Sequence, residues 1–92
     1  MIEAKQFKKV ETSIKAIANY RRLAIVSLLK KNGEMSVGDI AEELKISIQA
    51  ISKHLKLLER ADILSSDQRG LLVYYFLNKP LPNFVSNIVS TL

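Results

Sequence analysis

Apolar residues recur every three or four positions through most of the chain, which is the period of an amphipathic α-helix. The first stripe predicts a helix over about residues 2–18 and consists of Phe7, Val10, Ile14 and Ile17. Asn19 is a good N-cap for a second helix, whose stripe is Leu23, Val26 and Leu29. Two lysines followed by Asn32 and Gly33 predict where this helix ends.

Two shorter helices follow, joined by a tight turn. Ser36 stands three residues before Asp39, which is the spacing of a capping box. The third helix therefore begins here, and its inner positions are Val37, Ile40, Ala41 and Leu44. The turn covers residues 44–47, and Ser47 caps a fourth helix with inner positions Ile51, Leu55 and Leu58.

The period then changes from helical to extended. Residues 63–66 and the β-branched and aromatic run 71–77 predict two strands, with a turn over 67–70 between them. Residues 78–80 break this pattern, and a last helix is expected over 81–92. The predicted order is ααααββα, in one domain over residues 1–92. This is a mainly α fold with a β-hairpin wing, the winged helix–turn–helix plan.

The fourth helix has the surface chemistry of a DNA reader. Its outward positions are polar or cationic, and residues 47–58 include no acid, whereas the third helix has three. Gln49 can pair with an adenine edge, and lysines can reach guanine or phosphate. An ordinary solvated face would explain the lysines but not the missing acids. The helix residues predicted to contact DNA are Ser47, Gln49, Ala50, Ser52, Lys53, His54 and Lys56.

The hairpin turn adds one cation to this surface. We predict that Gln68, Arg69 and Gly70 form the tip of the wing and that Arg69 enters a minor groove or meets phosphate. The alternative is an ordinary turn with a glycine and a surface arginine. The neighbouring run Tyr74–Phe76 could stack on single-stranded bases, but core packing is the stronger interpretation.

Composition agrees with a polyanionic partner and excludes several chemistries. The 92 residues include 14 Lys and Arg against 9 Asp and Glu, a net charge of +5, which a lysine-rich solvated surface would also explain. There is no cysteine and only one histidine, so neither a disulfide nor a metal site is expected, and no cofactor is indicated. The chain has no long apolar run, so we expect a cytoplasmic protein without a membrane partner. No catalytic constellation is found, and we expect no enzyme.

Four stretches together resemble the ArsR-type winged-helix regulators. They are residues 15–19, 22–25, 51–58 and 73–78, of which the run from Ile51 to Leu58 is the most specific. The resemblance implies a homodimer built from the first and last helices, the fourth helix in the major groove, and repression relieved by a signal. The chain departs from metal-sensing members, because its third helix has no Cys and its last helix has no His, Asp or Glu. Tyr20 replaces a frequent Pro, and Lys45 a frequent Gly.

The two terminal apolar stripes leave more surface than a small domain can cover alone. We therefore predict a homodimer interface of Phe7, Val10, Ile14, Ile17, Leu81, Phe84, Val85, Ile88 and Leu92. The predicted function is a transcriptional regulator that binds an inverted-repeat site in double-stranded DNA as a homodimer. The sequence indicates no particular effector. The alternatives are an architectural DNA binder of weak specificity and a winged-helix module that binds proteins.

Overall fold

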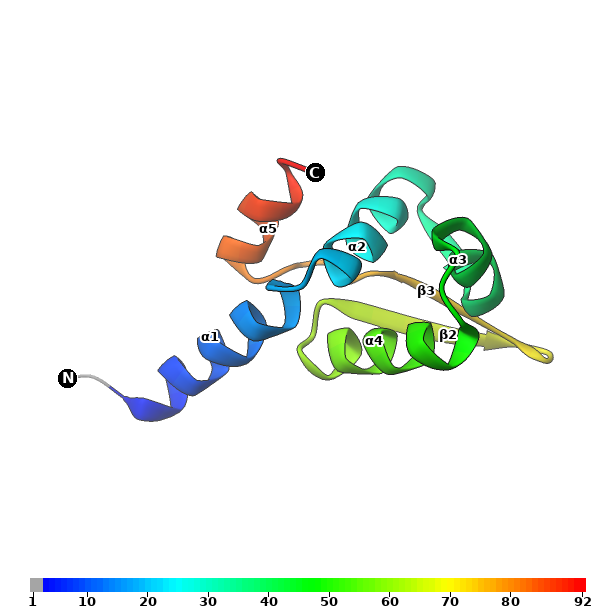
Figure 1. Ribbon diagram of the computed structural model, residues 1–92. Helices are drawn as coiled ribbons and strands as arrows, with labels where there is room; N and C mark the ends of the chain where they lie inside the picture. The colour runs from blue at the N-terminus through cyan, green and yellow to red at the C-terminus, as the bar shows by residue number, and fades with distance from the viewer. Residues whose placement is uncertain (1–2) are drawn as a thin grey trace.

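A computed structural model describes residues 3–92, which form helices around a small antiparallel sheet (Figure 1). The predicted order of four helices, a hairpin and a last helix is confirmed, and one short strand is added. The elements are α1 (Ala4–Ile17), α2 (Tyr20–Asn32), β1 (Glu34–Ser36), α3 (Val37–Leu44), α4 (Ile48–Arg60), β2 (Leu64–Arg69), β3 (Leu72–Leu77) and α5 (Asn83–Val89).

The predicted caps begin three of the helices. The Asn19 side chain accepts hydrogen bonds from the backbone N–H groups of Arg21 and Arg22, at 3.0 and 3.2 Å. Ser36 and Ser47 each accept one from the residue three positions later, both at 3.2 Å. Such caps each contribute about 1 kcal/mol to stability. Local side-chain chemistry therefore determines where α2, α3 and α4 start.

Strand β1 was not predicted. Its three residues pair antiparallel with β3, from Glu34 opposite Phe76 to Ser36 opposite Tyr74, so that β3 lies in the middle of the sheet. A three-residue strand is too short to show a period of two in the sequence, and its partner lies about forty positions away along the chain. The pairing joins the segment between α2 and α3 to the base of the hairpin.

The hairpin is longer than predicted, and its turn lies elsewhere. Residues Asp67 to Arg69 belong to β2, and the last pair of the ladder is Arg69 with Leu72. The turn is thus the two residues Gly70 and Leu71, with Gly70 at a φ of 62°. A positive φ at the first of two turn residues is favourable for glycine and matches the twist of the strands. Helix α5 is shorter than predicted, because it begins only after Pro82 and ends at Val89.

The core lies between the sheet and the helices packed on it. Its largest fully buried side chains are Ile25, Val26, Leu29, Ile40, Ile51, Leu55, Leu58, Ile63, Leu64 and Val85. Burial of each such side chain stabilises the fold by about 1.5–3 kcal/mol. Tyr75 is also buried, which agrees with core packing of the aromatic run rather than a base-stacking platform.

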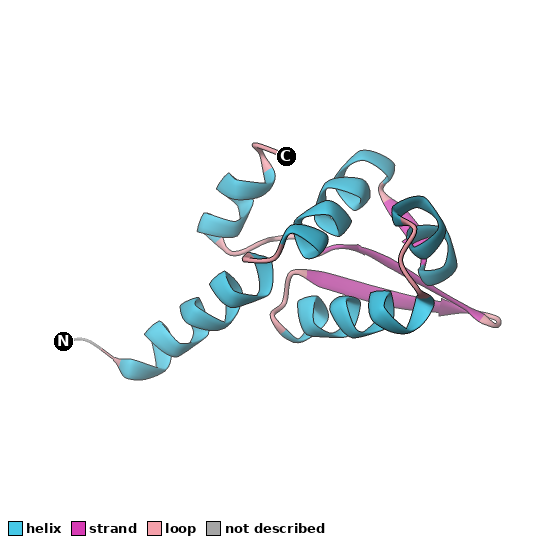
Figure 2. Cartoon of the chain, in the orientation of Figure 1, coloured by secondary structure: helices cyan, strands magenta, loops and turns pink. Residues whose placement is uncertain are grey.

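The long axis of the molecule separates two surfaces. Helices α1 and α5 lie at one end and the hairpin tip at the other, with α4 running along one side (Figures 1 and 2). None of the helices within residues 3–92 has the length and apolar character needed to cross a membrane.

Candidate DNA-binding surface

Helix α4 presents one row of polar and cationic side chains to solvent. Its buried stripe is Ile51, Leu55 and Leu58, each with no exposed surface. At 3.6 residues per turn, the opposite side of the helix contains residues 49, 53, 56 and 60. All four are exposed, and they are Gln49, Lys53, Lys56 and Arg60. Arg60 was missed by the sequence analysis, although the same spacing identifies it.

The two flanks of α4 face different elements. On one flank, the Glu59 carboxylate accepts a hydrogen bond from the Ser66 hydroxyl of β2 at 2.7 Å. On the other flank, His54 Nδ1 lies 3.3 Å from Arg22 Nη1 of α2. The exposed row therefore runs between the wing on one side and the N-terminal end of α2 on the other.

The surroundings of His54 favour the neutral form of its ring. Burial of the ring lowers its pKa, and the positive charges of Arg22 and Arg21 lower it further. Because a guanidinium only donates, Nδ1 must be the acceptor and the ring proton is assigned to Nε2.

The predicted DNA contacts outside the row differ in exposure. Ala50, Ser52 and His54 are half-buried on the flanks of α4, whereas Ser47 is exposed.

Arg22 joins three helices at this point. Its Nε donates to the carbonyl of Ala16, and its Nη2 donates to the carbonyl of Lys15 at 3.0 Å. These carbonyls belong to the last turn of α1, where they have no partner within the helix. Arg22 thus links α1, α2 and α4.

Arg69 does not occupy the position predicted for it. It lies in the last ladder pair before the turn rather than at the tip, and its guanidinium donates two bonds to Glu34 at 2.7 and 2.8 Å. A third bond goes to Asp67 at 3.0 Å, and the Tyr74 ring centroid is 4.6 Å away. The prediction that Arg69 forms the tip of the wing is therefore wrong. Its guanidinium is bonded to Glu34 of β1 and to Asp67, two residues earlier on β2.

These contacts shift the ionisation of both partners. Hydrogen bonding to Arg69 lowers the pKa of Glu34, and hydrogen bonding to Glu34 and Asp67 raises the pKa of Arg69. Both side chains are about half exposed, at 46% and 45%, so the pair orders the wing more than it stabilises the fold.

The tip itself is apolar. Leu71 is fully exposed, next to Gly70, and the Gln68 amide donates to the Gly70 carbonyl at 3.4 Å. Of the three residues predicted at the tip, only Gly70 lies in the turn. The sequence analysis missed Leu71, and it also missed Ile48, which is 55% exposed at the start of α4.

The predicted dimer surface divides into exposed and buried members. Five are exposed, at 36–57%: Phe7, Val10, Ile14, Ile88 and Leu92. Leu81 and Phe84 are half-buried against the core. Ile17 and Val85 are buried within the protomer, at 5% and 0% exposed, and this corrects their assignment to the interface. Their apolar surface is already covered by the chain's own helices.

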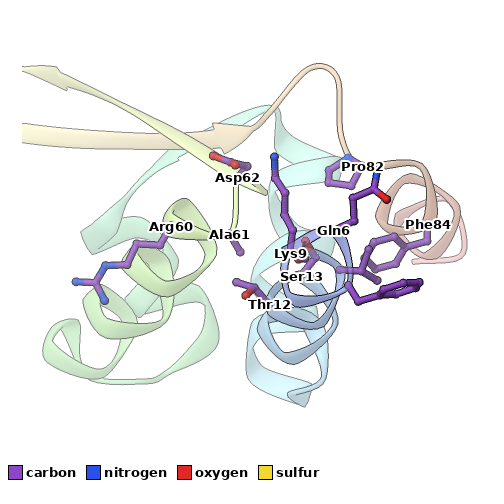
Figure 3. Close-up of a pocket in the computed structure, with 11 residues that line it drawn as sticks. Gln6, Lys9, Thr12, Ser13, Arg60, Ala61, Asp62, Pro82 and Phe84 are labelled. Atoms are coloured by element: carbon purple, nitrogen blue, oxygen red, sulfur yellow. Dashed lines mark hydrogen bonds between the residues drawn. The ribbon is translucent and has the colours of Figure 1, made fainter. Parts of the chain in front are cut away.

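A groove of about 600 Å³ lies beside this surface. Figure 3 shows its walls, in which side chains of α1 face the end of α4 and the start of α5: Gln6, Lys9, Thr12, Ser13, Arg60, Ala61, Asp62, Pro82 and Phe84. Phe7 and Val10 of the exposed stripe also line it. The Arg60 guanidinium points away from α1 in this view.

Comparison with known proteins agrees with this geometry. The helix–turn–helix domain family matches residues 17–67. The transcriptional repressor SdpR of Bacillus subtilis is 45% identical over 64 residues, 70% of each chain. The arsenical resistance operon repressor of Bacillus subtilis is 34% identical over 77% of this chain and 68% of that relative. The chain belongs to the ArsR-type winged helix–turn–helix regulators. The transcriptional activator HlyU of Vibrio cholerae is 36% identical to this regulator over 74 residues, which are 80% of this chain and 68% of the relative.

Solved structures extend the likeness to the whole fold. The structure of HlyU from Vibrio cholerae superimposes on the regulator with a TM-score of 0.80, at 31% identity, over 97% of this chain and 92% of the other. A homodimeric winged helix–turn–helix DNA-binding domain from Mycobacterium bovis has a TM-score of 0.82 at 27% identity, over 96% and 78% of the two chains. That domain is described as a possible ArsR-family regulator.

Proposed function

We propose that this regulator binds an inverted-repeat site in duplex DNA as a homodimer and represses transcription from it. One observation carries the proposal: α4 turns Gln49, Lys53, Lys56 and Arg60 outward in a single exposed row. No carboxylate occurs from Ser47 to Leu58, and the Glu59 carboxylate is bonded to Ser66 on the wing flank. The row can therefore enter a major groove without acidic repulsion.

The homodimer is supported by the apolar surface at the opposite end of the molecule. Phe7, Val10 and Ile14 lie exposed along α1, and Ile88 and Leu92 lie near the C-terminus. Apolar stripes of this kind are covered in symmetric pairs of subunits. The relative from Mycobacterium bovis is a homodimer. A two-fold axis would place two α4 helices about 34–36 Å apart, in successive major grooves.

The test begins with selection of bound duplexes from a random pool, followed by affinity measurements over a range of salt. We expect an inverted repeat and a preference for it over a scrambled duplex. Equal affinity for both duplexes would indicate an architectural binder, and weak binding without a steep salt dependence would indicate a protein-binding module. Either result would contradict the proposal. In a reporter assay, the selected site should lower expression when the regulator is present.

Individual residues in the row should differ in role. Gln49 can both donate to and accept from an adenine, so Gln49→Ala should cost about 1–3 kcal/mol on the selected site and relax one base position per half-site. Lys56→Gln should weaken selected and scrambled duplexes alike. Lys31→Gln is the matched control, because Lys31 is an exposed lysine in the last turn of α2, whereas α2 meets α4 through Arg22 near its start. If Gln49→Ala weakens both duplexes equally, Gln49 does not read a base.

A further inference from the structure

We propose that Arg21 and Lys45 form a binding site for a phosphate of the DNA backbone, on the flank of α4 opposite the wing. The site rests on the proposed function and extends it, because it adds a contact that the fourth helix and the wing do not supply. Neither residue was predicted to contact DNA.

The two cations line one surface hollow. It has a volume of about 300 Å³ and lies between the start of α2 and the turn that joins α3 to α4. Its walls are formed by Tyr20, Arg21, Ala24, Leu44, Lys45 and Ile46. Arg21 and Lys45 are both exposed, and Tyr20 is 75% exposed. The hollow is thus open to a large ligand and presents two positive charges to it.

The charges in this hollow are not neutralised by the protein. Across residues 3–92, neither Arg21 nor Lys45 takes part in an ion pair. The acids nearest in sequence, Glu42 and Glu43, are exposed and do not line the hollow. The Arg21 guanidinium lies 5.5 Å from the centroid of the Tyr20 ring, a cation–π contact that limits its movement without removing its charge.

Side chains rather than backbone groups would hold the phosphate. The backbone N–H groups of Arg21 and Arg22, at the start of α2, are already bonded to the Asn19 side chain. Lys45 has a left-handed backbone, with a φ of 55°, which glycine would adopt more easily. A glycine there would relieve the conformation but would also remove one of the two cations.

The position of the hollow relative to α4 identifies the ligand as DNA. A helix about 10–12 Å across fills a major groove about 12 Å wide, so a phosphate strand runs along each of its flanks. The wing lies on the flank marked by Glu59 and Ser66. Arg21 lies beside Arg22, whose guanidinium contacts His54 on the other flank. The opposite strand therefore has a cationic contact available as well.

The experiment removes the two charges and measures the salt dependence of binding to the selected duplex. The variant is Arg21→Gln with Lys45→Gln, and the control is Lys31→Gln with Lys79→Gln, which removes the same net charge from exposed positions outside the hollow. If each protomer loses one phosphate contact, the slope of log K against log salt should fall in magnitude by about 2 per dimer. The preference for selected over scrambled duplex should stay unchanged.

A second arm changes the DNA instead. Single phosphates of the selected duplex are replaced in turn by uncharged methylphosphonates. The wild type should bind more weakly when a contacted phosphate on either wall of the groove is replaced. The double variant should be insensitive to replacement on one wall and remain sensitive on the other. Lys45→Gly should also lower the magnitude of the salt slope, because it removes one of the two cations. It should keep or raise thermal stability, because glycine adopts the left-handed backbone more easily. A lower slope in this variant therefore cannot be attributed to loss of folding.

The outcomes separate the two proposals. A double variant that has the slope and methylphosphonate pattern of the control overturns the phosphate site, while the proposed function stands if the wild type still prefers the selected duplex. A wild type that shows no salt-dependent binding to any duplex overturns both.

Discussion

The guanidinium of Arg69 donates two parallel hydrogen bonds to the carboxylate of Glu34, at 2.7 and 2.8 Å, and so joins the wing to β1 across 35 positions of sequence. Bidentate pairs of this kind hold both side chains in one geometry. Arg69 immediately precedes the Gly70–Leu71 turn, so the pair ties the tip end of β2 to β1.

We predict that Glu34→Gln loosens the wing without unfolding the protein. Because the pKa of folded Glu34 is lowered, the ion pair contributes above the unfolded pKa of this carboxyl and is lost as the pH falls through the folded value. Amide hydrogen exchange at Gly70 and Leu71, compared between wild type and variant across this acidic range, measures the effect. Asp67→Asn, which removes the single bond at 3.0 Å, should have a smaller effect. Identical exchange in wild type and Glu34→Gln would contradict the prediction.

The dimer should depend on the exposed apolar stripes. In the protomer, the side chains of Ile14 and Ile88 are 49% and 36% exposed. Ile14→Asp and Ile88→Asp each put a carboxylate at one of these positions. Burial of an unpaired carboxylate is costly, so we expect both variants to sediment as monomers. Leu71→Asp is the control, since Leu71 is exposed in the hairpin turn and its substitution should leave the dimer intact. The hairpin turn lies at the opposite end of the molecule from α1 and α5 (Figure 1). A wild type that sediments as a monomer at micromolar concentration would refute the interface.

His54 should make stability depend on pH. Its folded pKa is lowered by burial and by the charge of Arg22, so the unfolded chain binds a proton more readily. Stability should therefore fall as the pH decreases through the ordinary range for histidine, about 6.5, toward the lower folded value. Thermal melting at several pH values tests this. His54→Asn keeps an acceptor for Arg22 but does not titrate, and its melting temperature should lose this pH dependence.

Metal ions should not control this regulator. The chain has no cysteine and one histidine, and within residues 3–92 no group of three or more His, Cys, Asp or Glu is placed to hold a metal. Zinc, cadmium or arsenite at one equivalent per protomer should leave DNA affinity unchanged in the binding assay. A clear loss of binding with any one of them would reveal a site that these residues do not suggest.

Much of the fold follows from interactions within a few residues. The caps at Asn19, Ser36 and Ser47 and the glycine at residue 33 are local hydrogen-bond and backbone preferences, so the sequence by itself determined where α2, α3 and α4 begin and where α2 ends. The inward stripe of α4 follows from its period of 3.6, and the same period determined which side chains form its outward row. The helix–turn–helix and the outward row could therefore be predicted.

The tertiary structure decided the features that depend on distant partners. Only the pairing of β1 with β3 brings Glu34 to Arg69, and only the packing of the terminal helices buries Ile17 and Val85. The approach of α2 to the α3–α4 turn likewise brings Arg21 and Lys45, which are 24 positions apart in the sequence, to the lining of one hollow. No local pattern specifies such contacts, because they arise from which apolar surfaces pack together once the whole chain has folded.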